Sequence, residues 1–145
     1  MRTDCWPCSV PGFVLSLALA VCCSVSCAAP SVHHEARGAL GPYSALVEAG
    51  ELVFVAGRIG ATEADFETEV ETTLGAVEVE LARAGLTLAD VVQATCYLSD
   101  IGLYERFNAV YAARVPRPWP ARAVVGVSGL PAGARVEIVA IARRR

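Results

Sequence analysis

The feature that most constrains the fold is a stripe of apolar side chains at helical spacing, with strand-like patterns on both sides of it. The stripe has five members at steps of four, four, three and four: Phe66, Val70, Leu74, Val77 and Leu81. This spacing places them on one face of an α-helix. We expect Thr62 to cap that helix, with Asp65 as its third residue, in a variant of the capping box. Gly85 follows the stripe and is expected to end the helix, because glycine adopts the left-handed conformation at little cost.

The segments around this helix have strand patterns or a second helical pattern. In chain order they are strands 44–49 and 51–57, the helix above, strand 92–98, a helix at 102–115, and strands 123–127 and 136–141. Val92 and Cys96 are expected on the apolar face of their strand, because apolar and polar residues alternate there. Cys96 is therefore interpreted as a packed core residue.

The order β-β-α-β-α-β-β predicts an α+β domain, in which two helices pack on one face of a mixed β-sheet. The other face of the sheet carries many small and β-branched residues. A domain of about 105 residues has no further segment to cover that face, so we expect the protein to form an oligomer.

The chain divides into an apolar leader at residues 1–31 and one domain at residues 32–145. The run from Phe13 to Cys23 is too short for a comfortable membrane span but matches the apolar core of a signal peptide. The leader holds one arginine, Arg2, as its only positive charge. Three interpretations stay open: an exported protein, periplasmic or secreted, with a cleaved leader; a leader lipidated at Cys27; or a cytoplasmic protein whose true start lies near Val32. No stable membrane span is expected.

The composition excludes several kinds of chemistry. The net charge is −3 and all twelve basic residues are arginine, so there is no basic lysine-rich surface for nucleic acid and no lysine for Schiff-base catalysis. The two histidines, His33 and His34, lie in a polar stretch and are interpreted as linker residues. Five of the six cysteines lie in the first 27 residues, so no disulfide framework is expected in the domain. We predict neither a metal site nor a cofactor.

Two charged residues stand in apolar strands near the C-terminus. Arg122 precedes the apolar run 123–127, and Glu137 lies within the apolar strand 136–141. A guanidinium group stays charged at physiological pH, so its burial is costly unless it meets an anion. Its planar array of donors suits a carboxylate. The residues alone leave two possibilities, an Arg122–Glu137 ion pair or a site that binds a carboxylate ligand.

Several short motifs, taken in order, resemble the reactive intermediate deaminase family (RidA, formerly YjgF). They are Gly41-Pro42-Tyr43-Ser44, residues 52–57, Ala84-Gly85-Leu86, Asp90-Val91-Val92, residues 107–111, Pro120-Ala121-Arg122, Leu130-Pro131 and residues 136–138. The match covers about residues 35–143. It implies a fold similar to a small trimeric chorismate mutase, and a homotrimer with ligand clefts between subunits.

The resemblance also implies roles for individual residues. Arg122 matches the arginine that binds the substrate carboxylate, and Glu137 matches the acidic residue that positions the attacking water. Tyr43, Asn108 and Gly57 match residues that line the cleft or contact the ligand. The family usually has Ser-Gly-Gln where this chain has Ala56-Gly57-Arg58. The change removes a hydroxyl group at Ala56, and we expect Arg58 to add a second cation near the cleft.

The resemblance predicts cofactor-independent hydrolysis of 2-enamine or 2-imine acids, such as 2-aminoacrylate and 2-iminopropionate, to 2-keto acids and ammonia. A second hypothesis is a non-catalytic protein that binds small carboxylates or keto acids in the same cleft. A third, cleavage of RNA, is disfavoured by the acidic balance and by the absence of lysine or a catalytic histidine.

Overall fold

The computed structural model describes residues 31–35 and 40–144. Residues 1–30 of the predicted leader lie outside them. The elements in chain order are β1 (Val32–Glu35), β2 (Ser44–Ala49), β3 (Leu52–Arg58), α1 (Phe66–Arg83), η1 (Leu88–Asp90), β4 (Val91–Leu98), η2 (Ile101–Leu103), α2 (Tyr104–Arg114), β5 (Ala121–Gly126), η3 (Pro131–Gly133) and β6 (Val136–Arg143). The predicted order of two helices and five of the six strands is therefore confirmed.

The six strands form one mixed sheet in the order β1-β2-β3-β6-β4-β5. Only the β4–β5 pair is parallel, and α2 makes the crossover between these two strands. The last strand, β6, lies at the centre between β3 and β4. This arrangement brings residues from the N-terminal and C-terminal halves of the domain next to one another.

Strand β1 corrects the interpretation of His33 and His34 as linker residues. Both lie in this edge strand, which pairs with β2 in antiparallel register. Nε2 of His34 lies 2.6 Å from Oε1 of Glu48, a hydrogen-bonding distance. The polar composition of the strand hid it from pattern analysis, because an edge strand with exposed side chains needs no apolar face.

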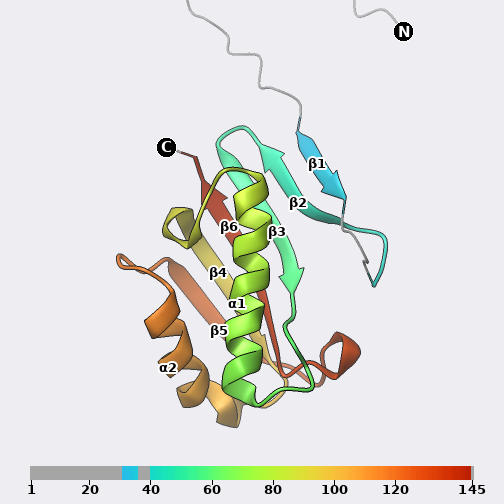
Figure 1. Cartoon of the computed structure of the whole chain (residues 1–145), viewed down its shortest axis with the longest axis vertical. Helices are drawn as coiled ribbons and strands as arrows, with labels where there is room; N and C mark the ends of the chain where they lie inside the picture. The colour runs from blue at the N-terminus through green and yellow to red at the C-terminus, as the bar shows by residue number, and fades with distance from the viewer. Residues whose placement is uncertain (1–30, 36–39, 145) are drawn as a thin grey trace, which may run out of the picture.

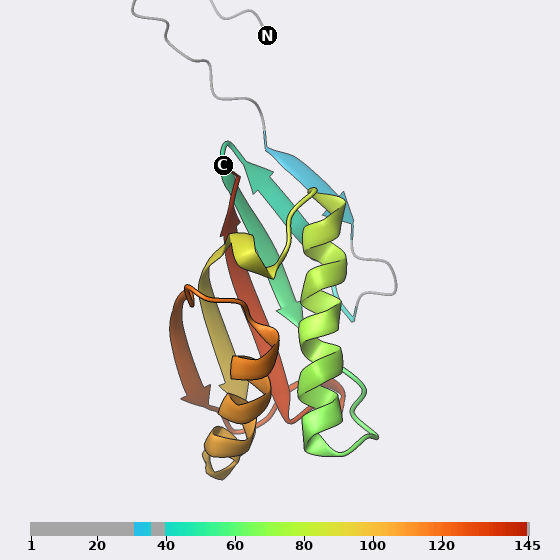
Figure 2. The ribbon, with the colours of Figure 1, turned by 60° about the vertical axis from the view of Figure 1, so that its left-hand side comes forward.

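Both helices cover the same face of the sheet (Figures 1 and 2), as predicted. All five residues of the apolar stripe on α1 are buried against this face, together with Phe107 of α2 and Cys96 of β4. Among the described residues no element covers the opposite face, where Phe54 and Val125 are 39% and 43% exposed. None of the helices that the structure describes has the length and apolar character required to cross a membrane.

The start of α1 differs from the expectation. Asp65, not Thr62, is the N-cap, and its carboxylate accepts a hydrogen bond of 3.0 Å from the backbone N–H of Thr68. This bond holds the pKa of Asp65 below its usual value. The helix ends as predicted, with Gly85 at a φ of +72°. Aspartate is a preferred N-cap residue, and here its carboxylate accepts hydrogen bonds from both the backbone N–H and the hydroxyl group of Thr68. The first turn of the helix therefore does not need Thr62 as a cap.

Strand β4 corrects the position of Val92. Its predicted apolar face holds for Ala94, Cys96 and Leu98, which are buried, but Val92 is 44% exposed. The pairing of β4 with β6 shifts between Val91 and Gln93. A bulge of this kind reverses the alternation of side chains, so Val91 rather than Val92 packs into the core.

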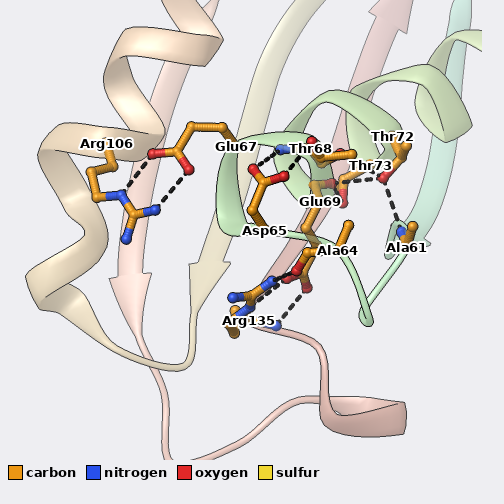
Figure 3. Close-up of polar contacts among 10 residues, drawn as sticks. All are labelled: Ala61, Ala64, Asp65, Glu67, Thr68, Glu69, Thr72, Thr73, Arg106 and Arg135. Carbon is orange, nitrogen blue, oxygen red and sulfur yellow. Dashed lines mark hydrogen bonds and ion pairs between the residues drawn. The ribbon is translucent and has the colours of Figure 1, made fainter.

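An ion pair between a buried carboxylate and a half-buried arginine joins α1 to the segment that leads into β6 (Figure 3). Glu69 is fully buried, and its carboxylate accepts hydrogen bonds from the backbone N–H and from Nε of Arg135, at 2.7 and 2.6 Å. Nη2 of Arg135 also donates to the carbonyl oxygen of Ala64 at 2.6 Å. Arg135 therefore joins the loop before α1, the helix itself and the start of β6, two residues before Glu137.

Candidate functional site

Five of the six site residues that the sequence singled out lie in two separate hollows of the chain. The first has a volume of about 440 Å³ and includes Arg122 and Asn108. The second has a volume of about 330 Å³ and includes Tyr43, Gly57 and Glu137. We refer to them as the Arg122 hollow and the Glu137 hollow.

The Arg122 hollow is built from the edge strand β5 and helix α2. Arg122 projects to the side of the sheet that carries the helices, where its Nη2 donates a 2.7 Å hydrogen bond to Oδ1 of Asn108. Its guanidinium carbon lies 4.6 Å from the ring centroid of Tyr111 and 5.5 Å from that of Phe107. These three residues of α2 sit within about one turn of each other, so a single helix face supports the cation.

Arg122 makes no ion pair with any carboxylate of the described chain. The Arg122–Glu137 pairing that the sequence left open is therefore not formed. A half-buried guanidinium with stacked rings and one amide partner retains donors for a bidentate anion. The hollow consequently has the chemistry of a carboxylate site.

Two other groups near Arg122 stay neutral at physiological pH. Burial raises the pKa of the Tyr111 hydroxyl and of the Cys96 thiol, each to about 12. The positive charge of Arg122 opposes both shifts but is the smaller effect. Neither group is therefore a base or an anionic nucleophile, and Cys96 is confirmed as a packed residue of the core.

The Glu137 hollow lies on the opposite side of the sheet, where β3 and β6 run side by side. Glu137 stands on β6 opposite Tyr97 of β4. Its Oε1 occupies the space of the missing side chain of Gly57, since a Cβ at that position would lie 1.7 Å from this oxygen. No real Cβ tolerates such a distance, so the present position of the carboxylate requires glycine at 57.

Tyr43, which is 42% exposed, and Ala56 also line the Glu137 hollow. Glu137 has no hydrogen bond or ion pair with another side chain in residues 31–35 and 40–144. A half-buried carboxylate without an ion-pair partner among the described residues keeps its oxygens as hydrogen-bond acceptors for a water molecule or a ligand.

Arg58 does not lie in this hollow, which corrects the expectation that it adds a cation there. Its guanidinium is on the helix side, 3.6 Å from Oε1 of Glu80 and 3.3 Å from the carbonyl oxygen of Ala45. The pairing of β3 with β6 shifts between Val55 and Arg58. This irregularity reverses the alternation, so Gly57 faces Glu137 while Arg58 turns toward α1.

The two hollows cannot combine within one chain. Strand β4 separates β5, which carries Arg122, from β6, which carries Glu137, and neighbouring strands lie about 5 Å apart. The two side chains also point to opposite faces of the sheet. Within one chain the two charged groups therefore belong to separate hollows on opposite faces of the sheet.

Sequence analysis missed two lining residues, Trp119 in the Arg122 hollow and Ile59 in the Glu137 hollow. Pro120 and Pro131, which also line the hollows, were part of the family motifs but received no role. Trp119 and Ile59 lie in connections without periodic patterns, and the position of Trp119 between two prolines was the one signal for it. No group of three or more His, Cys, Asp or Glu side chains in the described part of the chain is arranged to hold a metal ion.

The fold and the two hollows define an α+β domain of the chorismate-mutase-like class with a candidate site for a small carboxylate. A family model described as Endoribonuclease L-PSP matches residues 33–144. The chain therefore belongs to this family, which is the RidA/YjgF family of the resemblance.

Individual relatives agree with this assignment. The RutC family protein y4sK of Sinorhizobium fredii is 35% identical over 119 residues, which cover 77% of this chain and 94% of that protein. The 2-iminobutanoate/2-iminopropanoate deaminase of Salmonella typhimurium is 34% identical, with 76% and 93% covered. The crystal structure of RidA from an Antarctic Psychrobacter superimposes with a TM-score of 0.72 at 32% identity, with 76% and 94% covered.

Proposed function

We propose that this protein hydrolyses 2-imino acids, and their 2-enamine tautomers, to 2-keto acids and ammonia without a cofactor. The observation that carries the proposal is the guanidinium of Arg122, supported by Asn108 and Tyr111 and without a carboxylate partner in the described chain. The similarity to an imine deaminase of Salmonella supports it at the level of the family.

The active assembly in this proposal is a homotrimer with clefts between subunits. Two features support it: the separation of Arg122 from Glu137 within one chain, and the uncovered apolar face of the sheet. In a cyclic trimer each contact joins two different surfaces, so one copy presents the Arg122 hollow and the next presents the Glu137 hollow.

The reaction requires orientation and one proton shuttle. Arg122 binds the substrate carboxylate through two parallel hydrogen bonds and so fixes the neighbouring C2 atom. Glu137 of the adjacent subunit accepts a proton from a water molecule as the water oxygen bonds to C2 of the protonated imine. The proton then passes to the amino nitrogen of the carbinolamine, the C2–N bond breaks and ammonia leaves. The hydroxyl proton is transferred to Glu137 and then to the ammonia, so that C2=O forms and the products are the 2-keto acid and ammonium.

The test is imine hydrolysis by the purified full chain. An amino-acid oxidase generates imino acids in the assay, and the loss of imine is measured against its rate in buffer. We expect clear acceleration by the wild-type protein and a loss of at least about 100-fold in Arg122→Ala, because a charged anchor is removed. The control is Arg143→Ala, which removes an arginine that is 62% exposed and paired with Glu51.

A second function, binding of small keto acids without catalysis, is favoured by one observation. Ala56 lines the Glu137 hollow and offers no hydroxyl group to a ligand. If a 2-keto acid raises the melting temperature while imine hydrolysis stays at the buffer rate, the binding function replaces the deaminase. Full activity in Arg122→Ala would contradict the carboxylate anchor.

A further inference from the structure

The Arg122 hollow has an apolar wall that a three-carbon substrate does not need. Apart from Arg122 and Asn108, its lining residues are Tyr111, Ala112, Trp119 and Pro120. Its volume of about 440 Å³ falls in the range of sites that take drug-sized ligands, roughly 300–1,000 Å³. A site for 2-iminopropionate alone would need far less apolar surface.

Trp119 is the largest member of this wall, and its position is fixed from several sides. Prolines at 118 and 120 flank it, and its indole N–H donates a 3.3 Å hydrogen bond to the carbonyl oxygen of Val115. The guanidinium carbon of Arg117 lies 4.0 Å from the ring centroid. An indole that is held in this way loses little conformational entropy when a ligand packs on it.

Although it is fixed, Trp119 remains 48% exposed in the chain. Large aromatic rings are usually buried, and an exposed one beside a polar anchor is typical of a binding surface. Trp119 shares the hollow with Arg122, so a molecule whose carboxylate binds the guanidinium has its C2 substituent within reach of the indole.

The lining of the hollow favours an apolar over an acidic substrate side chain. Arg58 is paired with Glu80 on the helix side, and Arg117 stacks on the indole of Trp119 but does not line the hollow. Among the described residues, Arg122 is the only cation that lines this hollow.

We infer that Trp119 is a specificity-determining residue and that the preferred substrates are 2-imino acids with aromatic or long apolar side chains. This inference rests on the proposed function, in which Arg122 binds the carboxylate. The substrate side chain packs against the indole of Trp119, beside Tyr111 and Ala112. Removal of the indole therefore lowers the preference for large substrates without removing the anchor.

The first test compares kcat/KM for imines generated from phenylalanine and from alanine, using the full chain. We expect the wild-type protein to prefer the phenylalanine-derived imine by about tenfold or more, since one methylene group in an apolar pocket already discriminates by roughly 10–200-fold. Trp119→Ala should abolish most of this preference, and Trp119→Phe should keep part of it. Val79→Ala, which truncates an exposed side chain of α1, should leave the ratio unchanged.

The second test measures binding of phenylpyruvate and pyruvate by calorimetry, because 2-keto acids carry the same side chains but are not hydrolysed. The wild-type protein should bind phenylpyruvate more tightly by a similar factor, and Trp119→Ala should not. Unchanged melting temperatures in the variants show that the fold is intact.

The outcomes separate this inference from the proposed function. Deamination with no preference, or with a preference for the alanine-derived imine, overturns the role of Trp119 and leaves the deaminase standing. Tighter binding of phenylpyruvate that depends on Trp119, but without imine hydrolysis, supports the specificity and contradicts the deaminase. Absence of both hydrolysis and selective binding overturns both proposals.

Discussion

The two hollows hold their charged groups in different ways. Side-chain contacts hold Arg122: Asn108 accepts a hydrogen bond from it, and the rings of Tyr111 and Phe107 pack against the guanidinium group. Glu137 has no side-chain partner among the described residues, and its position depends on the absence of a side chain at Gly57, whose space the carboxylate oxygen fills.

The difference corresponds to the two tasks in the proposed reaction. A carboxylate anchor must keep one orientation, so fixed contacts serve it well. A group that accepts and returns a proton must remain free of strong partners, since an ion pair would hold it in the charged form. The predictions below perturb each hollow in turn, beginning with the largest expected effect.

The first prediction removes the proton acceptor. Glu137→Gln keeps the shape of the side chain but cannot accept a proton, so kcat should fall by on the order of 10²–10⁴-fold. Binding of a 2-keto acid should persist, because Arg122 is unaltered. Glu105→Gln, an exposed change on α2, is the matched control. A kcat within about twofold of the wild type would exclude Glu137 as the base.

The second prediction fills the gap above Gly57. In Gly57→Ala the new Cβ would lie 1.7 Å from Oε1 of Glu137, so the carboxylate must move by an ångström or more. A displacement of about 1 Å at a reacting group costs about 100-fold in rate. Gly75→Ala is the control, because a Cβ there meets nothing within 4 Å. Equal activity of Gly57→Ala and the wild type would show that the carboxylate position is not important.

The third prediction alters the contact of Arg122. Asn108→Asp would place a carboxylate 2.7 Å from Nη2 of Arg122, where it competes with the substrate for the cation. KM and the dissociation constant of a 2-keto acid should both rise about tenfold. Asn108→Ala should have a smaller effect, since it removes one hydrogen bond and adds no charge. A larger rise of KM in Asn108→Ala than in Asn108→Asp would argue against binding of the substrate carboxylate by Arg122.

The fourth and smallest prediction concerns stability at high pH. The pKa of Cys96 is raised from 9.0 to about 12, so between these values the unfolded chain loses a proton that the folded chain keeps. The free energy of unfolding should therefore fall as the pH rises above 9, by up to about 1.4 kcal/mol per pH unit from this group. In Cys96→Ala the free energy of unfolding, measured by urea titration at each pH, should fall less steeply as the pH rises. An identical slope would mean that the thiol titrates normally in the fold.

Sequence patterns predicted most of the fold because its core elements have clear periods. The stripe on α1 and the alternation at Ala94, Cys96 and Leu98 follow directly from which side chains are buried. The errors at Val92 and Arg58 share one physical cause, which is that side-chain direction depends on hydrogen-bond register. The bulges near Val92 and Arg58 turn the side chains of these residues to the other face of the sheet, and the amino-acid composition does not reveal such bulges.

Five residues that line the two hollows were named from the sequence, but their arrangement was not predictable from it. Arg122 and Glu137 stood out because a charge in an apolar strand requires a reason, and Asn108, Tyr43 and Gly57 came from the family resemblance. Their division between two faces of the sheet depends on the strand order β6-β4-β5, which pairs distant segments. Trp119 was missed because its connection has no regular pattern.

The central claim is that each site takes Arg122 from one subunit and Glu137 from another. The most direct test mixes Arg122→Ala and Glu137→Gln chains by joint refolding, after each homotrimer has been shown to be inactive. In a randomly assembled cyclic trimer, about one quarter of the clefts would combine an intact Arg122 with an intact Glu137. We predict recovery of about a quarter of wild-type imine deamination at a 1:1 ratio. No recovery in well-folded mixed trimers would contradict a site shared between subunits.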